Sequence, residues 1–264
     1  MAKGIELFNR SNVFQKDPIP PSPQPKQINC DRSHRFYDLC TINGPAVLDP
    51  VSSTLYLSDP TISSATVDEK IRPYPRKWEK AGDGRNTGVH SDFKLKKPSM
   101  SSSSTNFPAI VFSAVGYTGN FFHDFNDGFI PLFITVNSVF PNNQDFILVI
   151  SQARNWWISK YGDLLHTYSK HPIIIPENET STHCFPSATL GLISHGSMTI
   201  NPKLMPNSQA LTHFRAFLDK AYNHGQNHPW KFNSPKAAAT TGAGDSKRRW
   251  WTCDFKPKPS ETFS

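Results

Sequence analysis

The strongest constraint on the fold is a stretch of about 85 residues in which short apolar runs alternate with helical patterns. Residues 109–112 are apolar throughout, and residues 145–150 are apolar after Asp145, so both are short enough for buried strands. Residues 172–175 and 184–193 continue the series. One helix is expected between the first two strands, and another is expected over residues 155–168. Strands that alternate with helices are typical of βαβ units with a parallel sheet. The sequence therefore predicts an α/β domain.

The segments before this stretch have a different character. Residues 39–42 and 53–57 are β-rich and are separated by glycine and prolines, so we expect them to pair as a hairpin. Residues 68–106 are charged and contain several prolines, which favours a long irregular excursion. In the last apolar strand, Pro186 is expected to cause a break.

A final helix is predicted over residues 208–222, with Ser208 as its N-cap. Its expected buried stripe consists of Leu211, Phe214, Phe217, Leu218, Ala221 and Tyr222. Beyond it the periodicity stops, and residues 225–264 are expected to be a disordered tail. Residues 1–29 are rich in proline and read as a disordered linker. The folded domain is therefore expected over residues 30–224.

Charge and hydropathy exclude some functional classes. The formal charge of +7 comes from 28 basic and 21 acidic residues. The basic residues are spread thinly and accompany no nucleic-acid-binding motif, so we expect no nucleic-acid partner. No apolar run is long enough to span a bilayer, and the first residues lack the apolar core of a signal peptide.

One segment concentrates polar groups that can carry chemistry. Gly116-Tyr-Thr-Gly-Asn-Phe-Phe-His-Asp-Phe-Asn-Asp127 follows the first apolar strand and reads as a turn leading into a helix. At about 100° per residue, the helix gathers polar side chains on one face. They are Asn120, His123, Asp124 and Asp127. The opposite face is expected to anchor the helix in the core through Phe122, Phe125, Phe129, Leu132 and Phe133.

An amide, an imidazole and two carboxylates on one face are suited to acid–base work on a hydroxyl group. His123 and Asp127 are four residues apart and can meet on the helix surface. The same pair can also serve as a structural hydrogen bond, so both interpretations stay open. Pro131 removes a backbone donor, and we expect the helix to kink or restart there.

The remaining motifs concern metals, disulfides and glycans. The chain contains no Asp-x-Asp triplet of the kind that holds a divalent ion against a sugar nucleotide, so no metal requirement is expected. Cys30 and Cys40 bracket a short polar loop, which suits a disulfide in an oxidising compartment. Asn178 begins an N-glycosylation acceptor sequence.

Five separated blocks of the chain resemble plant glycosyltransferase family 61. The longest is the Gly116–Asp127 segment with the Ile-Pro-Leu-Phe-Ile-Thr135 that follows it. The others are Cys30-Asp-Arg-Ser through Asp38-Leu-Cys40, Lys70-Ile-Arg-Pro-Tyr-Pro75, His183-Cys-Phe-Pro186 with Gly191-Leu192, and Phe214-Arg-Ala-Phe-Leu218. The resemblance covers about residues 30–224 and keeps the order of the family.

This resemblance implies transfer of xylose or arabinose from a UDP-sugar to a xylan or N-glycan acceptor in the Golgi lumen, with inversion of the anomeric centre. It implies that the chain is the Rossmann-like, acceptor-side N-terminal half of a GT-B type enzyme. His123 or Asp127 is then the expected base. Asn120 and Asp124 are expected at the substrate, where Gly119 allows close approach.

The chain also departs from the pattern of the family. The N-terminal membrane anchor of the family is not recognisable, and nothing after Tyr222 resembles its nucleotide-binding second domain. An incomplete glycosyltransferase is therefore expected. The alternative is a catalytically inactive module that binds a carbohydrate or a partner.

Overall fold

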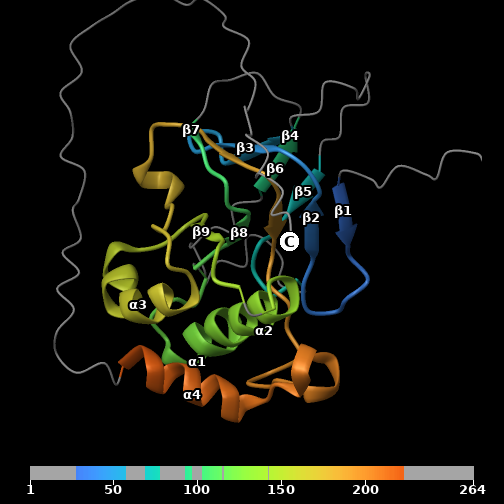
Figure 1. The fold of residues 1–264 in the computed structure, drawn as a ribbon, viewed down its shortest axis with the longest axis vertical. Coiled ribbons are helices and arrows are strands. Elements are labelled where there is room, and N and C mark those ends of the chain that lie inside the picture. Colours follow the sequence, from blue (N-terminus) through green and yellow to red (C-terminus); the bar gives the residue numbers. More distant parts are fainter. Residues whose placement is uncertain are drawn as a thin grey trace, which may run out of the picture.

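The computed structural model describes residues 28–57, 69–77, 93–96, 103–114, 116–141 and 143–222. In this part of the chain, the strands form two sheets, and the helices gather at the opposite end of the molecule from β3, β4 and β7 (Figure 1). The mixed α/β architecture confirms the predicted fold class. The predicted disordered ends, residues 1–29 and 225–264, lie almost entirely outside the described residues.

The first sheet has the strand order β1-β2-β11-β8-β9. Its strands are β1 (Ile28–Asp31), β2 (Leu39–Ile42), β8 (Ala109–Phe112), β9 (Ile147–Ile150) and β11 (Ala188–Leu190). β8 pairs in parallel with both β9 and β11, whereas β2 pairs antiparallel with β1 and β11. The predicted parallel strands are thus confirmed. Assignment to one half of a GT-B enzyme remains a prediction.

The second sheet has the order β5-β6-β4-β3-β10-β7. Its strands are β3 (Ala46–Asp49), β4 (Thr54–Leu57), β5 (Glu69–Ile71), β6 (Phe93–Lys96), β7 (Ser103–Ser104) and β10 (His183–Phe185). The predicted hairpin is wrong, because β4 pairs with β3 while β2 belongs to the other sheet. Where the structure describes the expected excursion over residues 68–106, it contains three short strands.

The helices connect the strands of the first sheet and cover it. They are α1 (Phe121–His123), the π-helix η1 (Asp124–Phe129), α2 (Ile130–Val139), α3 (Asn155–Tyr168) and α4 (Leu211–Tyr222), with the 3-10 turns η2 (Pro176–Asn178), η3 (Pro202–Leu204) and η4 (Pro206–Ser208). α3 has the predicted bounds. The strand expected over residues 172–175 is reduced to one parallel bridge between Ile174 and Val149.

The central strands are apolar throughout because both of their faces are buried. Consecutive side chains of a strand point to opposite sides of the sheet. Ile110, Phe112, Leu148 and Ile150 pack with the helices, whereas Ala109, Val111, Ile147 and Val149 pack with the second sheet. The first sheet is therefore the middle layer of the described part of the chain.

One two-stranded ribbon passes from the first sheet into the second. β2 continues through a turn at Gly44 into β3, and β11 is preceded by β10 across Pro186. Both halves of this ribbon are antiparallel, with Ile42 opposite Ala188 and Ala46 opposite Phe185. The break predicted at Pro186 is confirmed, and it marks the place where the chain changes sheets.

The final helix packs less deeply than the sequence predicts. Phe214 and Ala221 are buried, and Phe217 and Leu218 pack against the core. Leu211 and Tyr222 are 44% and 49% exposed, so their predicted burial is wrong. The predicted N-cap is also wrong, because η4 ends at Ser208 and the helix begins at Leu211.

Two glycines should respond to alanine in opposite directions. Gly191 has a φ of +97°, and a Cβ there would lie 2.2 Å from the Asp38 carbonyl oxygen. Gly191→Ala should destabilise the fold by about 2–4 kcal/mol through left-handed strain and overpacking. Gly162 lies within α3 with open space around it, so Gly162→Ala should stabilise by about 0.5–1 kcal/mol. Urea unfolding would measure both changes in the free energy of unfolding. Unfolding midpoints equal to that of the wild-type chain would contradict these two predictions.

Candidate active site

The polar segment identified in the sequence links β8 to α2 through an unusual helix. Asn120 caps α1, and its Oδ1 accepts a hydrogen bond from the Phe122 backbone N–H at 3.0 Å. The chain then forms the π-helix η1, and regular α-helix begins at Ile130. The predicted restart of the helix beside Pro131 is confirmed. Short π-helical segments within helices are frequent at functional sites.

The π-helix places the two carboxylates of the segment in different surroundings. Asp124 is 5% exposed, and its Oδ1 accepts from the Trp157 indole N–H at 3.0 Å and the Gly119 backbone N–H at 3.2 Å. Its Oδ2 accepts from the Tyr161 hydroxyl at 2.9 Å. Asp124 is thus bound to core groups and does not join the cluster around Asp127, contrary to the predicted common polar face.

The apolar side of the segment is largely as predicted. Phe125, Phe129, Leu132 and Phe133 are buried in the main core. Phe122 is 44% exposed, so its predicted role as a core anchor is wrong. The prediction assumed a uniform α-helix from Asn120, whereas the hydrogen-bond pattern changes at Asp124.

Asp127 is the centre of a buried polar cluster. Its Oδ2 lies 2.7 Å from His123 Nδ1, 3.1 Å from Arg76 Nη1 and 3.1 Å from the Tyr74 hydroxyl. Its Oδ1 accepts from the Asn126 amide at 2.6 Å. The Asp127 side chain is only 3% exposed, so these donors replace water around its charge.

The short contact with Asp127 determines the tautomer of His123. Arg76 Nη1 also lies 3.0 Å from His123 Nδ1, but a guanidinium can only donate. If Nδ1 carried a lone pair, that lone pair would face the Asp127 carboxylate at 2.7 Å. The favourable arrangement has Nδ1–H donating to Asp127 and Arg76 donating to the same carboxylate. Neutral His123 then keeps its lone pair on Nε2.

The His123 ring lies at the boundary between this cluster and solvent. Its side chain is 17% exposed and stacks on Tyr117, with ring centroids 4.4 Å apart. The Arg76 guanidinium lies over the other ring of this stack, 4.8 Å from the Tyr117 centroid. No described residue hydrogen-bonds Nε2 of His123. The arrangement can orient an imidazole and leave one nitrogen for a proton.

Three exposed aromatic side chains lie on or against the stretch from Gly119 to His123. Phe121, Phe122 and Trp156 are 63%, 44% and 44% exposed. Phe122 contacts His123 edge-on, with centroids 5.2 Å apart. Trp156 lies over Gly119, where an added Cβ would meet the indole at 3.2 Å. Gly119 is exposed and has a φ of +103°, so this position favours glycine. Exposed apolar groups of this kind often mark binding surfaces.

Three members of the cluster were missed by reasoning from the sequence. Tyr74, Arg76 and Tyr117 surround the His123–Asp127 pair, but they come from the segments before and after β8. Tyr74 and Tyr117 each lie in a block that resembles the glycosyltransferase family, and this is the available signal. No periodicity indicates that Arg76 and Tyr74, 51 and 53 positions away, share the buried Asp127 carboxylate.

The other predicted positions lie away from this cluster. Cys30 and Cys40 face each other across β1 and β2 and form a disulfide. Asn178 ends η2 and is exposed, so it is accessible for glycosylation, which stays a prediction. The contacts of Asn120 and Asp124 with substrate also stay predictions. Of these two residues, Asn120 is exposed, whereas Asp124 is committed to core donors.

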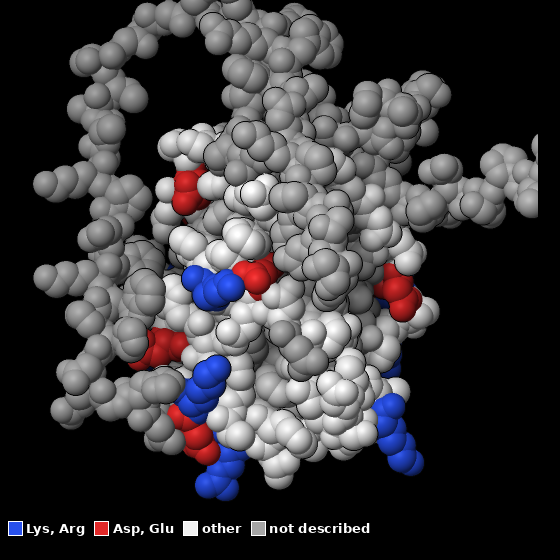
Figure 2. Space-filling view, in the orientation of Figure 1, with Lys and Arg blue, Asp and Glu red and all other residues white. Residues whose placement is uncertain are grey.

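Figure 2 shows how charge is distributed over one face of the described residues. There the Lys and Arg side chains lie apart and alternate with acidic ones. The described residues of this face form no continuous basic patch, and the expectation of no nucleic-acid partner stays a prediction. Among the described helices, none combines the length and apolar character needed to cross a bilayer.

Comparison with known proteins identifies relatives that match most of the chain. No family model matches the chain. It is 35% identical over 224 residues to the xylan glycosyltransferase MUCI21 of Arabidopsis thaliana, covering 82% of this chain and 45% of that protein. Two Oryza sativa subsp. japonica proteins are also similar, the alpha-1,3-arabinosyltransferase XAT2 and the beta-1,2-xylosyltransferase XYXT1. Their identities are 31% over 198 residues and 29% over 232 residues.

These matches cover most of this chain but a smaller share of the relatives. The two rice proteins cover 75% and 80% of the chain, which spans 33% and 48% of their lengths. The chain thus spans half or less of the curated relatives it matches. The similarity includes the segments that build the His123–Asp127 cluster, since the matched share reaches 82% of the chain. Over most of its length the chain is thus similar to plant xylan xylosyl- and arabinosyltransferases, which supports its resemblance to glycosyltransferase family 61.

Proposed function

We propose that this chain forms the acceptor-side part of an inverting pentosyltransferase that transfers xylose or arabinose from a UDP-sugar to a xylan or glycan acceptor. The observation that carries the proposal is the 2.7 Å contact between Asp127 and His123 Nδ1, which leaves Nε2 as a proton acceptor at the surface. The names of the relatives favour pentose as the transferred sugar.

In the proposed reaction, His123 acts as the general base. Its Nε2 takes the proton from the acceptor hydroxyl while the hydroxyl oxygen attacks the anomeric carbon of the donor. The bond from that carbon to the diphosphate breaks, and UDP leaves with the bonding electron pair. Attack from the face opposite the leaving group inverts the anomeric centre. The imidazolium that forms is stabilised by the Asp127 carboxylate.

Tyr74 and Arg76 have a positioning role in this scheme. Both donate to Asp127 Oδ2 and so fix the carboxylate that orients His123. Because these groups are largely buried, the cluster is held in place before substrate binds. The exposed rings of Phe122 and Trp156 beside His123 and Gly119 offer apolar surfaces for the face of an acceptor sugar.

The chemistry of the chain also supports the proposed compartment. The Cys30–Cys40 disulfide is expected to persist in the oxidising lumen of the secretory pathway. The exposed Asn178 sequon is compatible with the same environment. We therefore propose that the chain acts in the Golgi lumen. We also expect that a metal chelator leaves the rate of transfer unchanged.

Asp127→Asn tests the role of the carboxylate. The variant should lower the rate of pentose transfer from UDP-xylose or UDP-arabinose to xylan oligosaccharides by about 10–100-fold, because an orienting carboxylate becomes an amide. Asp145→Asn is the matched control, since Asp145 contacts His171 Nε2 at 3.2 Å on the surface. Unchanged transfer in Asp127→Asn would remove Asp127 from the mechanism.

A binding measurement separates the second candidate function. The exposed rings of Phe122 and Trp156 also suit a module that binds the acceptor without catalysis, which is the alternative. Calorimetric binding of xylan oligosaccharides, with no transfer and no affinity for UDP, would support this alternative. Inverted product identified by nuclear magnetic resonance would support the transferase.

A further inference from the structure

A small basic pocket lies next to the His123–Asp127 cluster. It has a volume of about 190 Å³ and is lined by Asp38, Lys70, Arg72, Tyr74 and Lys77. Tyr74 belongs to both sites, because its side chain lines the pocket while its hydroxyl donates to Asp127 at 3.1 Å. The pocket is therefore linked to the proposed base, His123, through the side chains of Tyr74 and Asp127.

The lining carries an excess of positive charge. Three of its side chains are cationic and one is acidic, so the formal charge of the lining is +2. The Asp38 carboxylate is already paired, with Lys77 Nζ at 2.8 Å from Oδ1 and Arg32 Nη1 at 3.1 Å from Oδ2. Because Asp38 is paired with Lys77 and Arg32, the lining keeps a net positive formal charge.

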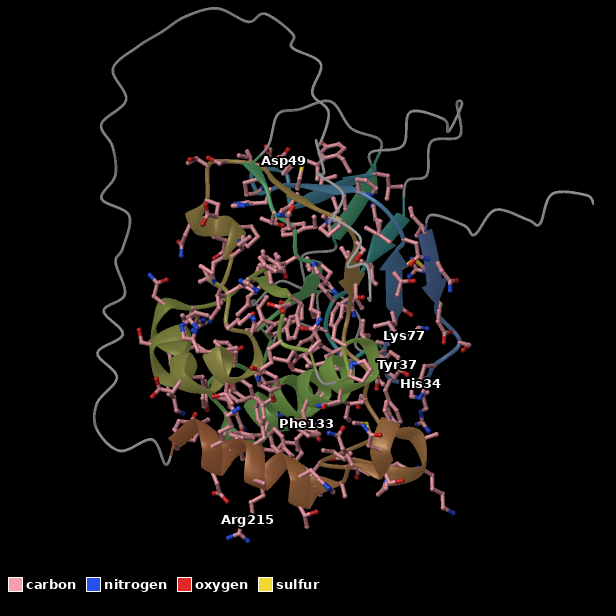
Figure 3. All side chains as sticks on the ribbon, in the orientation of Figure 1. His34, Tyr37, Asp49, Lys77, Phe133 and Arg215 are labelled. Carbon is pink, nitrogen blue, oxygen red and sulfur yellow. A yellow bond between two sulfur atoms is a disulfide. The ribbon has the colours of Figure 1, made fainter. Side chains whose placement is uncertain are left out.

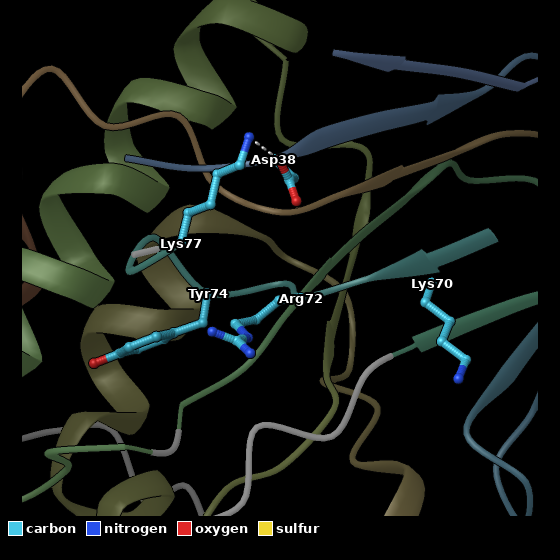
Figure 4. A pocket seen from close by; sticks show the side chains of 5 residues that line it. All are labelled: Asp38, Lys70, Arg72, Tyr74 and Lys77. Carbon is cyan, nitrogen blue, oxygen red and sulfur yellow. Dashed lines mark ion pairs between the residues drawn. The ribbon is translucent and has the colours of Figure 1, made fainter. Parts of the chain in front are cut away.

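The side chains reach the pocket from several directions. Figure 4 shows Arg72 between Tyr74 and Lys70, with the ion pair of Lys77 and Asp38 on another side. Lys77 is held in place by the loop before β2, since its ammonium donates to the backbone carbonyls of Arg32 and His34. Figure 3 shows Lys77 close to His34 and Tyr37, whose rings stack.

The backbone that carries these side chains is firmly anchored. Ile71 and Tyr74 are 1% and 5% exposed, and Pro73 and Pro75 fix two φ angles of the segment. The Pro73 carbonyl accepts a hydrogen bond from the Ser113 backbone N–H at 2.9 Å. The cationic groups are therefore presented on a rigid base, which lowers the entropic cost of binding.

We propose that this pocket binds an oxyanion carried by a sugar substrate. Arg and Lys together favour carboxylate or phosphate oxygens, and Arg can bind either group through two parallel hydrogen bonds. The volume is below the roughly 300–1,000 Å³ typical of pockets for drug-sized ligands, so a whole nucleotide does not fit. The occupant is one anionic group, either the carboxylate of a uronic acid residue in the acceptor or a phosphate of the donor.

This inference rests on the proposed function only in calling the ligand a substrate, because the pocket can bind an anion without any transfer reaction. The variants Lys70→Glu and Arg72→Gln test it by calorimetry with three probes. The probes are pyrophosphate, a neutral xylan oligosaccharide and the same oligosaccharide carrying a uronic acid. Lys203→Gln, at an exposed position in η3, is the control. Thermal melts identify any variant that fails to fold. If Arg72→Gln does not fold, the result for Lys70→Glu, at an exposed position, decides the outcome.

The wild-type chain should bind at least one anionic probe, and both pocket variants should weaken that binding by roughly 10–100-fold. Affinity for the neutral oligosaccharide should be unchanged, as should every affinity of Lys203→Gln. Loss of the uronic acid preference assigns the pocket to the acceptor, and loss of pyrophosphate binding assigns it to the donor. The proposal is overturned if neither anion binds, or if both variants bind anions like wild type. If the chain bound anions but showed no activity in the transfer assay, the proposed function would be wrong and the anion site would stand.

Discussion

His123→Asn is expected to lower the rate of pentose transfer by about 10²–10⁴-fold, the usual contribution of a general base. Asparagine places an amide N–H near the position of His123 Nδ1, so the hydrogen bond to Asp127 can persist. The group that disappears is Nε2, which no described residue engages. The variant therefore separates the chemical role of the imidazole from its contribution to the fold.

The measurement is the initial rate of transfer at saturating acceptor, together with the KM for the acceptor. The variant should lose turnover while the KM changes little, because Nε2 acts in the proton transfer. His171→Asn provides the control, because His171 also contacts an aspartate and is 16% exposed. A variant with an unchanged rate would show that His123 is structural.

Asp124→Ala is expected to destabilise the chain by about 3–5 kcal/mol without any direct effect on chemistry. Alanine would leave three buried donors without an acceptor, namely the Gly119 N–H, the Trp157 indole and the Tyr161 hydroxyl. Burial raises the pKa of Tyr161 well above its usual range, and the hydrogen bond to Asp124 raises it further. Tyr161 therefore stays protonated as a donor at neutral pH.

A graded series would test this assignment. Asp124→Asn keeps one carbonyl oxygen for the two donors to Oδ1, so a smaller loss of about 1–2 kcal/mol is expected. Asp163→Asn, on the exposed side of α3, should stay within about 0.5 kcal/mol of wild type. Urea unfolding followed by tryptophan fluorescence reports all three values. If Asp124→Ala unfolded at the wild-type midpoint, the hydrogen bonds to Asp124 would contribute little to stability.

Local patterns predicted the parts of the fold that depend on neighbours in the sequence. The bounds of α3 and the buried strands β8 and β9 follow from periodicity and uniform apolar character. The partners of β2 and β4 did not follow, because β2 pairs with β11 more than a hundred positions away and β4 pairs with β6 about 40 positions away. Short runs with equal β propensity give no indication of which sheet each will join.

The candidate site was predictable to a similar degree. The pairing of His123 with Asp127 follows from their spacing of four residues. Asp124 is separated from the Asp127 cluster by the π-helical hydrogen-bond pattern, and no single residue predicts that pattern. Arg76 reaches the site from a segment before β8, so its approach is decided by packing of the whole chain. Residues that share a site across distant segments need tertiary structure to be found.

The bent ribbon formed by β2–β3 and β10–β11 constrains how the substrate-facing groups can move. A hinge between the sheets would have to flex both strands at the same level, at Gly44 and at Pro186. Lys70 sits on the second sheet and His123 follows a strand of the first, so the ribbon keeps their separation nearly constant. The two groups thus lie at a nearly fixed separation. In the proposed transferase a glycan would contact both of them, and any closure over it would come from elements outside these two sheets.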